Sequence, residues 1–204
     1  MSANLDSKVA LVTTTSMCSY LGIAAGSAEE EEVDLIINAA STRAAEMTGR
    51  GVDESGYSRL VSTSRTEYYD GDGSDTLLLR AYPISTVASV YVDTERSYAS
   101  TDLLDSGDYV YYSMDGTIKT DGSLLASGNK SIKVTYTGGY STIPYDLQLA
   151  IKELVMFWYK RNTDKRVGVA SMSAGDKSMS YENDVPQSVL SIFTRYRDHR
   201  GLVA

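Results

Sequence analysis

The side chains that most often carry catalysis are scarce in this sequence. The only histidine is His199 and the only cysteine is Cys18, which excludes a histidine-based metal cluster and an internal disulfide framework. No Gly-x-Ser-x-Gly motif is present, and no glycine-rich phosphate loop stands between a strand and a helix. Two carboxylates could meet in space, but nothing in the sequence singles out a pair. We therefore expect no catalytic residue, no cofactor and no enzyme.

Two groups of acidic residues could in principle bind a cation. Asp70, Asp72 and Asp75 have almost the spacing of a calcium loop. However, Asp75 stands where an EF-hand needs glycine and Ala81 where it needs glutamate, so a solvated turn is favoured. The run Glu29–Glu32 stands where a helix should begin, and the helix dipole favours acids there. A helix start is therefore favoured over a metal site.

Composition limits the class of protein. The 204 residues suffice for one domain, or for one domain with an insertion. The net charge of −8 makes the chain a poor non-specific binder of nucleic acid, and a basic excess occurs only in residues 143–204, which hold seven acids and nine bases. No apolar run is long enough for a membrane span, and no signal peptide is expected. The single cysteine suggests a reducing compartment.

The stretch 144–161 predicts the helix around which the rest is organised. Its polar side, which includes Lys152 and Lys160, is interrupted by Leu149 and Met156, seven residues apart and nearly in line. These two are either scattered surface residues or part of a contact with another subunit. The second interpretation predicts a subunit interface at Leu149, Lys152, Met156 and Lys160. The opposite side is apolar and should face the core: Leu147, Ala150, Ile151, Leu154, Val155 and Trp158.

Three further helices are expected. A short one runs from Met17 to about Leu21, with a cap at Thr14, Thr15 or Ser16. A longer one spans about 28–48, opened by a capping box of Ser27 and Glu30 and ended by Gly49 and Gly51. The last begins between Asp184 and Pro186, and its apolar face is formed by Val189, Ile192, Phe193 and Tyr196.

Between the second helix and the helix at 144–161 the sequence alternates with a period of two. The clearest strand is 130–137, and a strand is also expected at 84–93. Hairpins are predicted for 66–70 with 76–80 across DGDGSD, and for 109–113 with 116–120, while 94–108 is a polar excursion. The predicted fold class is α+β: a small bundle of about four helices (1–64 and 141–204) with an inserted antiparallel β-domain (65–140).

The order of these features resembles the head–tail connector, or adaptor, proteins of tailed bacteriophages. The resemblance runs from about Met17 to Arg197. It is carried by YLGI, by the Thr-Gly-Arg turn, by EYYDGDGSDTLLLRAYPISTVASVYVD, by KVTYTGGYSTIPYDLQLAIKELVMFWYKR and by SAGDKSMSYENDVPQSVLSIFTRYR. None of these is a catalytic signature, so the resemblance depends on order and spacing.

The resemblance implies a virion protein of the neck, at the portal vertex, present in the host cytoplasm during assembly. Such proteins form a ring, typically of twelve copies, beneath the portal protein. The ring extends the channel for double-stranded DNA, which passes without sequence-specific binding, and receives the tail or a further neck protein. No membrane is involved.

A serine-rich segment at 168–183 should dock on the portal or on a neck protein and become ordered only there. Within it, 172–173 and 178–181 could pair as a hairpin across 174–176. The basic end could meet an acidic portal rim or DNA, or could simply cap the last helix. The expected docking residues are Ser171, Met172, Ser173, Lys177, Ser178, Tyr181, Arg195, Arg197 and Arg200.

Two other functions compete with a connector. The sixteen tyrosines, beside two phenylalanines and one tryptophan, would suit a carbohydrate- or receptor-binding module of a virion. Such a module should gather its tyrosines on one concave face, whereas a connector should spread its contacts over two opposite flanks. An uncharacterised hydrolase ranks last, because the sequence offers no site for it.

Overall fold

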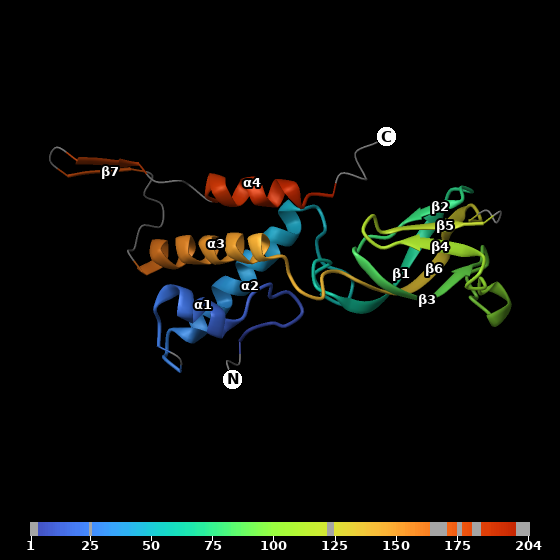
Figure 1. The fold of residues 1–204 in the computed structure, drawn as a ribbon, viewed down its shortest axis with the longest axis horizontal. Coiled ribbons are helices and arrows are strands. Elements are labelled where there is room, and N and C mark those ends of the chain that lie inside the picture. Colours follow the sequence, from blue (N-terminus) through green and yellow to red (C-terminus); the bar gives the residue numbers. More distant parts are fainter. Residues whose placement is uncertain are drawn as a thin grey trace. The chain divides into compact units, whose positions relative to one another are not determined.

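The computed structural model describes residues 4–24, 26–121, 125–163, 171–174, 177–180 and 185–198. The chain divides into two compact units. The helical unit comprises Met1–Ser58 and Ile143–Ala204, and the β unit comprises Arg59–Thr142 (Figure 1). Four helices and antiparallel sheets of three strands each confirm the predicted α+β class. No helix in the described ranges is both long and apolar enough to cross a membrane.

The first helix, α1, spans Thr14–Leu21. A cap at Thr14 would place the first helical residue at Thr15, one residue later than observed. Its cap is Thr13, whose side-chain oxygen accepts from the backbone N–H of Ser16 at 3.2 Å. The predicted cap at Thr14, Thr15 or Ser16 is therefore wrong. The reason is a tertiary contact, because the Thr14 hydroxyl donates to the buried Asp34 carboxylate at 2.5 Å.

The second helix, α2 (Glu30–Met47), lacks the predicted capping box. Its cap residue, Glu29, makes no side-chain capping bond, and Ser27 Oγ bonds Glu29 Oε2 at 3.4 Å. Glu30 does reach back, but its carboxylate accepts from the N–H of Gly26 at 2.9 Å. The predicted end is confirmed, since Gly49 takes a φ of 71° just after the helix.

The core of the helical unit lies where α2 and α3 (Tyr145–Thr163) pack on each other, with α4 (Gln187–Arg195) against α3 (Figure 1). The predicted apolar side of α3 is buried apart from Trp158, which is partly exposed. Helices that precede and follow the β unit in sequence thus bury their apolar faces together, as expected. The fully buried side chains of this core include Ile37, Ala40, Ala44, Leu147, Ile151, Leu154, Val155 and Val189.

The β unit consists of two three-stranded antiparallel sheets. One has the order β1 (Thr63–Gly71), β6 (Gly128–Gly138), β3 (Ile84–Val92). The other has the order β2 (Thr76–Leu78), β5 (Thr117–Thr120), β4 (Tyr109–Tyr112), so the second predicted hairpin is confirmed (Figure 1). The buried side chains of these sheets form a single apolar core that includes Leu77, Leu79, Ile84, Val90, Ile118, Ile132 and Val134.

The predicted pairing of 66–70 with 76–80 is wrong. β1 pairs with β6, and β2 pairs with β5, so the DGDGSD turn carries the chain from one sheet to the other. The crossing depends on close backbone approach at Gly71, where an added Cβ would lie 1.8 Å from the carbonyl oxygen of Ala126. The alternation correctly predicts strands on both sides of the turn. However, β6 is longer than β2, and β1 pairs with it over more residues.

The excursion at 94–108 lies along the free edge of β3. Leu103 forms an antiparallel bridge with Tyr91, and the N–H of Leu104 donates to the carbonyl oxygen of Val90 at 2.9 Å. It includes a short 3₁₀ helix, Ser100–Asp102. An exposed strand edge invites pairing with other chains, so this segment protects β3 from such pairing.

Candidate assembly surfaces

The outward side of α3 carries the row of residues that the sequence assigned to a subunit interface. Leu149 is 45% exposed, Lys152 and Met156 are partly exposed, and Lys160 is exposed. Tyr145, four residues before Leu149, extends the same row and is 83% exposed. Sequence reasoning missed Tyr145, although its spacing of four from Leu149 was a visible signal. We call these five residues the α3 row.

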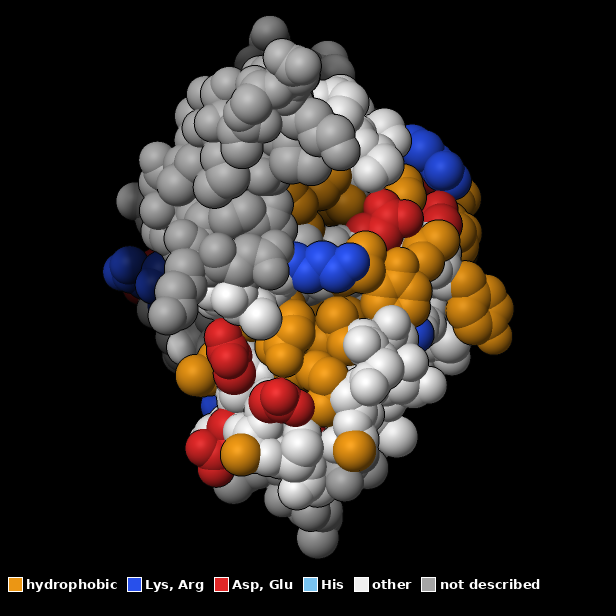
Figure 2. Space-filling model, turned by 90° about the vertical axis from the view of Figure 1, so that its left-hand side faces the viewer, with side chains coloured by type: hydrophobic (Ala, Val, Ile, Leu, Met, Phe, Trp, Pro, Cys, Tyr) orange, Lys and Arg blue, Asp and Glu red, His pale blue; other side chains and the backbone are white. Residues whose placement is uncertain are grey.

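An aromatic side chain from α1 adjoins the α3 row. The Lys152 Nζ lies 5.8 Å from the centroid of the Tyr20 ring, and Tyr20 is itself 39% exposed. Hydrophobic side chains gather on the face shown in Figure 2, with acidic and basic side chains among them. The outer surface of this unit therefore has exposed apolar side chains among its polar ones, as expected of a surface that contacts other molecules.

The end of α4 is fixed to the start of α3 through Asp146. Its carboxylate accepts from the Tyr196 hydroxyl at 2.5 Å and lies 3.0 Å from the Arg195 guanidinium. The hydrogen bond from Tyr196, then the N–H of Leu147 and the charge of Arg195, lower the pKa of Asp146. Arg195 thus has an intramolecular partner, whereas Arg197 is exposed and Arg200 lies outside the described residues.

The serine-rich segment contains the hairpin that the sequence predicts. β7 (Ser171–Ala174) pairs antiparallel with β8 (Lys177–Ser180), so Ser171 faces Ser180 and Met172 faces Met179. This places the backbones of the expected docking residues Ser173, Lys177 and Ser178 in one two-stranded sheet. Tyr181 and the rest of 168–183 lie outside the described residues.

The outer face of the sheet β1-β6-β3 carries mainly polar and tyrosine side chains. Cross-strand register places Tyr68, Lys133 and Tyr91 in one row, and the next row contains Thr66, Thr135 and Ser89. The Lys133 Nζ lies 5.2 Å from the ring centroid of Tyr91 and also 5.2 Å from that of Tyr98. This lysine is already held between aromatic rings of its own chain.

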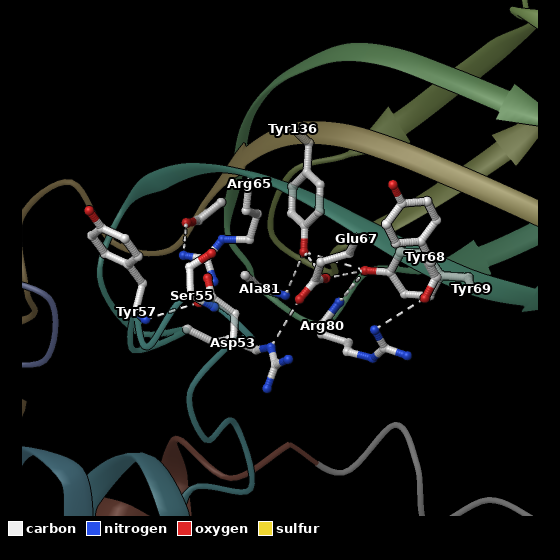
Figure 3. Close-up of polar contacts among 12 residues, drawn as sticks. Asp53, Ser55, Tyr57, Arg65, Glu67, Tyr68, Tyr69, Arg80, Ala81 and Tyr136 are labelled. Atoms are coloured by element: carbon white, nitrogen blue, oxygen red, sulfur yellow. Dashed lines mark hydrogen bonds and ion pairs between the residues drawn. The ribbon is translucent and has the colours of Figure 1, made fainter. Parts of the chain in front are cut away.

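The inner face of the same sheet holds a buried polar network, shown in Figure 3. Glu67 is 6% exposed and accepts from the hydroxyls of Tyr69 at 2.5 Å and Tyr136 at 2.7 Å. Its other oxygen lies 3.2 Å from Arg59 Nε. The N–H groups of Arg80 and Ala81 donate to the same two tyrosine hydroxyls, at 3.2 and 3.1 Å. Every carboxylate oxygen here is occupied, so the network is structural.

The acids that could have held a cation are each used locally. Asp70 accepts from the N–H of Lys130 at 2.7 Å, Asp72 from that of Ser74 at 2.8 Å, and Asp75 from the hydroxyl of Thr76 at 2.8 Å. Within the described part of the chain, no three His, Cys, Asp or Glu residues are grouped as metal ligands. The solvated-turn interpretation of DGDGSD agrees with these bonds.

The sequence matches a known protein family. The family described as "Head completion protein" matches residues 10–199. The chain belongs to the head completion protein family. This confirms the predicted resemblance to head–tail connectors and indicates a structural role in completing the head of a virion. No curated protein matches the sequence significantly.

Solved structures share the fold of this head completion protein. The neck of an empty gene transfer agent (GTA) particle with C6 symmetry matches with a TM-score of 0.60 and 18% identity, covering 95% of this chain and 93% of that one. The neck of a native GTA particle with C12 symmetry matches with a TM-score of 0.54 and 16% identity, covering 97% of both chains. A chain of the native GTA virion matches with a TM-score of 0.60, 17% identity and coverage of 95% and 93%.

The predicted site residues of this head completion protein fall into three separate places. The interface residues Leu149, Lys152, Met156 and Lys160 share one side of α3. The hairpin residues stand on β7 and β8, and the basic residues Arg195 and Arg197 stand at the end of α4. The structure therefore brings each predicted group together along its own element.

Proposed function

We propose that this protein forms a ring beneath the portal of a tailed-phage-like particle, joins the capsid to the tail or neck, and extends the DNA channel. The ring would contain twelve copies. Membership of the head completion protein family supports the structural role. The related chains come from necks with C6 and C12 symmetry, which supports a cyclic arrangement.

The α3 row is the observation that carries this proposal. A helix whose buried side already packs on α2 and α4 has no structural need for Tyr145, Leu149 and Met156 on its outward side. In a ring, those side chains are removed from water by the next copy. Full burial of an exposed leucine or methionine contributes about 1.5–3 kcal/mol, so Leu149, which is 45% exposed, would contribute roughly half of this at every interface around the ring.

A DNA conduit should not hold its cargo tightly. The net charge of −8 opposes extensive neutralisation of phosphates, because such contacts need clustered lysine and arginine. Double-stranded DNA would therefore pass through the ring without sequence-specific binding, and we propose no enzymatic activity on it.

Docking on the portal or on a further neck protein would use the hairpin and the basic end of α4. A two-stranded hairpin is at best marginally stable by itself, and both outer edges of β7-β8 can accept a further strand. Strand addition by the partner would order the segment 168–183. Arg197, just beyond the C-terminal end of α4, supplies an exposed positive charge for an acidic rim.

The test is assembly with the portal protein, followed by electron microscopy and mass photometry. Rings of twelve copies stacked on portal are expected, together with slower amide exchange at 171–180 after portal is added. A matched control lacks 171–180 and should still form rings without docking. A protein that stays monomeric with portal under all assembly conditions contradicts the proposal.

The competing binding-module function receives less support from the described tyrosines. Tyr69 and Tyr136 are buried, Tyr68 and Tyr91 lie on the outer face of one sheet, and Tyr112 lies on the other sheet. A sugar-binding face needs its aromatic side chains together. Tyr68, Tyr91 and Tyr98 do gather around Lys133, but Lys133 already occupies the space between the rings of Tyr91 and Tyr98, and the remaining tyrosines are divided between the core and the other sheet, which favours a connector.

A further inference from the structure

The sheet β1-β6-β3 has two outer edges, and only one of them is covered within the chain. The edge of β3 is covered by the 94–108 segment, through the bridge between Tyr91 and Leu103. β1 forms the other edge, and among the described residues its only strand partner is β6. An uncovered strand edge presents N–H and C=O groups that another strand can bond. β1 is therefore the open edge of this sheet.

The hydrogen bonds of β6 show which main-chain groups of β1 point outward. The carbonyl of Ser131, on β6, accepts from the N–H of Asp93 at 2.7 Å, so the odd-numbered residues of β6 bond on the β3 side. The even-numbered residues of β6 then bond β1, and register pairs them with the odd-numbered residues of β1 up to Tyr69. The even-numbered residues of β1 thus point their N–H and C=O groups away from β6. We call the outward main-chain groups of Ser64, Thr66 and Tyr68 the β1 edge.

Most of the β1 edge is unused within the subunit. The Arg80 guanidinium donates to the carbonyl oxygen of Tyr68 at 3.4 Å. No segment of the described chain supplies a partner for the outward main-chain groups of Ser64 and Thr66, whose side chains are also exposed. Such groups need a partner outside the subunit, either water or another molecule.

The features that commonly block an edge strand are absent from β1 or already neutralised. The strand contains no proline and no lysine. Inward charges can also block an edge, because pairing would bury them, and Arg65 and Glu67 do point inward. However, each is only 6% exposed and already held, Arg65 by the carbonyls of Val61 and Gly138 and Glu67 by Arg59. A further strand would therefore bury no new charge.

We propose that the β1 edge receives an extended segment of the tail-side neck protein, which adds a fourth strand to the sheet β1-β6-β3. This inference rests on the proposed function and names the surface that its tail-side partner would use. Main-chain hydrogen bonds would hold the segment, and neighbouring side chains would select it. Because Ser64, Thr66 and Tyr68 are uncharged, the segment should place uncharged β-branched or aromatic side chains beside them.

The other partners of the proposed function fit the β1 edge less well. Pairing of β1 with β1 of another copy would be a two-fold contact, whereas neighbours in a cyclic ring meet head to tail. The α3 row is already proposed for that neighbour, and the β7-β8 hairpin and Arg197 for the portal. All of those surfaces belong to the helical unit. The β unit has no role in them, which leaves it for the tail-side protein.

The test is amide exchange at single residues of the ring docked on portal, before and after addition of tails purified, with their neck proteins, from the same kind of particle. The N–H groups of the β1 edge should exchange about tenfold more slowly once tails are bound. The odd-numbered residues between them should be slow in both states, because β6 already bonds them. This alternation distinguishes strand addition from general cover of the outer face.

Two results of the exchange experiment overturn the proposal. One is unchanged exchange at the β1 edge with tails bound. The other is slowing that appears already on ring formation or on docking to portal, which assigns the β1 edge to another copy or to the portal. Failure of the wild type to form rings on portal or to bind tails contradicts the proposed function instead.

A matched pair of variants tests the same edge by binding. Thr66→Pro removes an outward N–H without loss of a bond to β6, as proline on an edge strand allows. Thr66→Val loses the same hydroxyl but keeps the N–H. Electron microscopy should show that Thr66→Pro forms rings on portal but joins about tenfold fewer tails, whereas Thr66→Val joins tails like the wild type. Circular dichroism confirms folding, and the wild-type exchange pattern decides alone if Thr66→Pro is unfolded. Equal joining by two folded variants overturns the proposal.

Discussion

The helical unit and the β unit bury different kinds of side chain. Between α2 and α3 the buried faces are almost wholly apolar, with Asp34 and Ser41 as the polar exceptions on α2. In the β unit, the inward side of β1 presents Arg65, Glu67 and Tyr69 in succession. The contact between α2 and α3 is therefore stabilised mainly by packing, whereas the sheet β1-β6-β3 is stabilised by packing together with a buried ionic hydrogen-bond network.

The two kinds of buried side chain should differ in how well they tolerate substitution. An apolar core accepts many combinations of side chains of similar volume, whereas a buried carboxylate needs all its partners at once. The β unit should therefore keep one geometry strictly. The helical unit is left free to vary on its outward sides, which include the α3 row. The two units should therefore lose stability by different amounts on substitution and at different pH.

Loss of the buried carboxylate should have the largest effect. Glu67→Ala leaves Arg59 with a largely buried charge and leaves the Tyr69 and Tyr136 hydroxyls without their acceptor. Breaking a buried pair in this way costs about 3–5 kcal/mol. Urea unfolding, with amide exchange to localise the loss to β1 and β6, measures it.

The matched control for Glu67→Ala is Thr66→Ala, the neighbouring residue on the exposed side of the same strand. This substitution removes only the cross-strand hydrogen bond with the Thr135 hydroxyl and should change stability by roughly 0.2–1 kcal/mol. Equal losses for the two variants would show that the strand, and not the network, is what matters.

A cavity in the helical core should have the next largest effect. Ile151 is fully buried between the helices, so Ile151→Ala should cost about 2–5 kcal/mol and Ile151→Val only about 0.5–1.5 kcal/mol. Leu149→Ala, on the outward side of the same helix, should leave the stability of the subunit nearly unchanged and impair the ring instead. A graded loss at 151 is the expected mark of an apolar core; a similar cost for both substitutions would contradict it.

Alkaline pH should weaken the β unit selectively. Burial, and the nearby charge of Glu67, raise the pKa of Tyr69 and Tyr136 above the ordinary value. A raised pKa in the folded state means that this stability is complete below about pH 10 and is lost as the pH rises further. The expected slope is about 1.4 kcal/mol per pH unit for each tyrosine.

This loss can be measured between pH 9 and 12 by tyrosinate absorbance and by amide exchange, with the exchange recorded over about minutes to hours. Tyr136→Phe should make the slope about half as steep, because one of the two titrating groups is gone. If the protection factors of α2 and α3, which are exchange rates corrected for the base-catalysed intrinsic rate, fall at the same pH as those of β1 and β6, the selective effect on the β unit is absent.

The same contrast explains what the sequence could predict. Helical periodicity determines both sides of a helix, so the buried side of α3 and its outward row were visible in the residues from Leu147 to Lys160. The hairpin across DGDGSD failed because strand pairing is decided by long-range competition, in which β6 takes β1. The network was missed, although Arg65 and Glu67 alternate with exposed residues and so had to point inward together.

Acidic pH should have the smallest effect, and on the helical unit. The pKa of Asp146 is lowered chiefly by the hydrogen bond from Tyr196, so its contribution is present above about pH 4 and is lost as the pH falls further. The Arg195 side chain is 68% exposed, and such exposed pairs contribute about 0–1 kcal/mol. Asp146→Asn should therefore lower the stability only slightly and remove the acid dependence of amide exchange in α4.

Arg195→Ala and Arg197→Ala divide the two roles considered for this basic end. If Arg195 serves only to hold α4 on α3, its loss should mimic Asp146→Asn and leave docking on portal intact. Arg197, which is exposed, should show the opposite pattern, with unchanged stability and weaker, salt-sensitive docking. Docking that is insensitive to both substitutions assigns the basic residues to the helix end alone, and then the hairpin must carry the contact with portal.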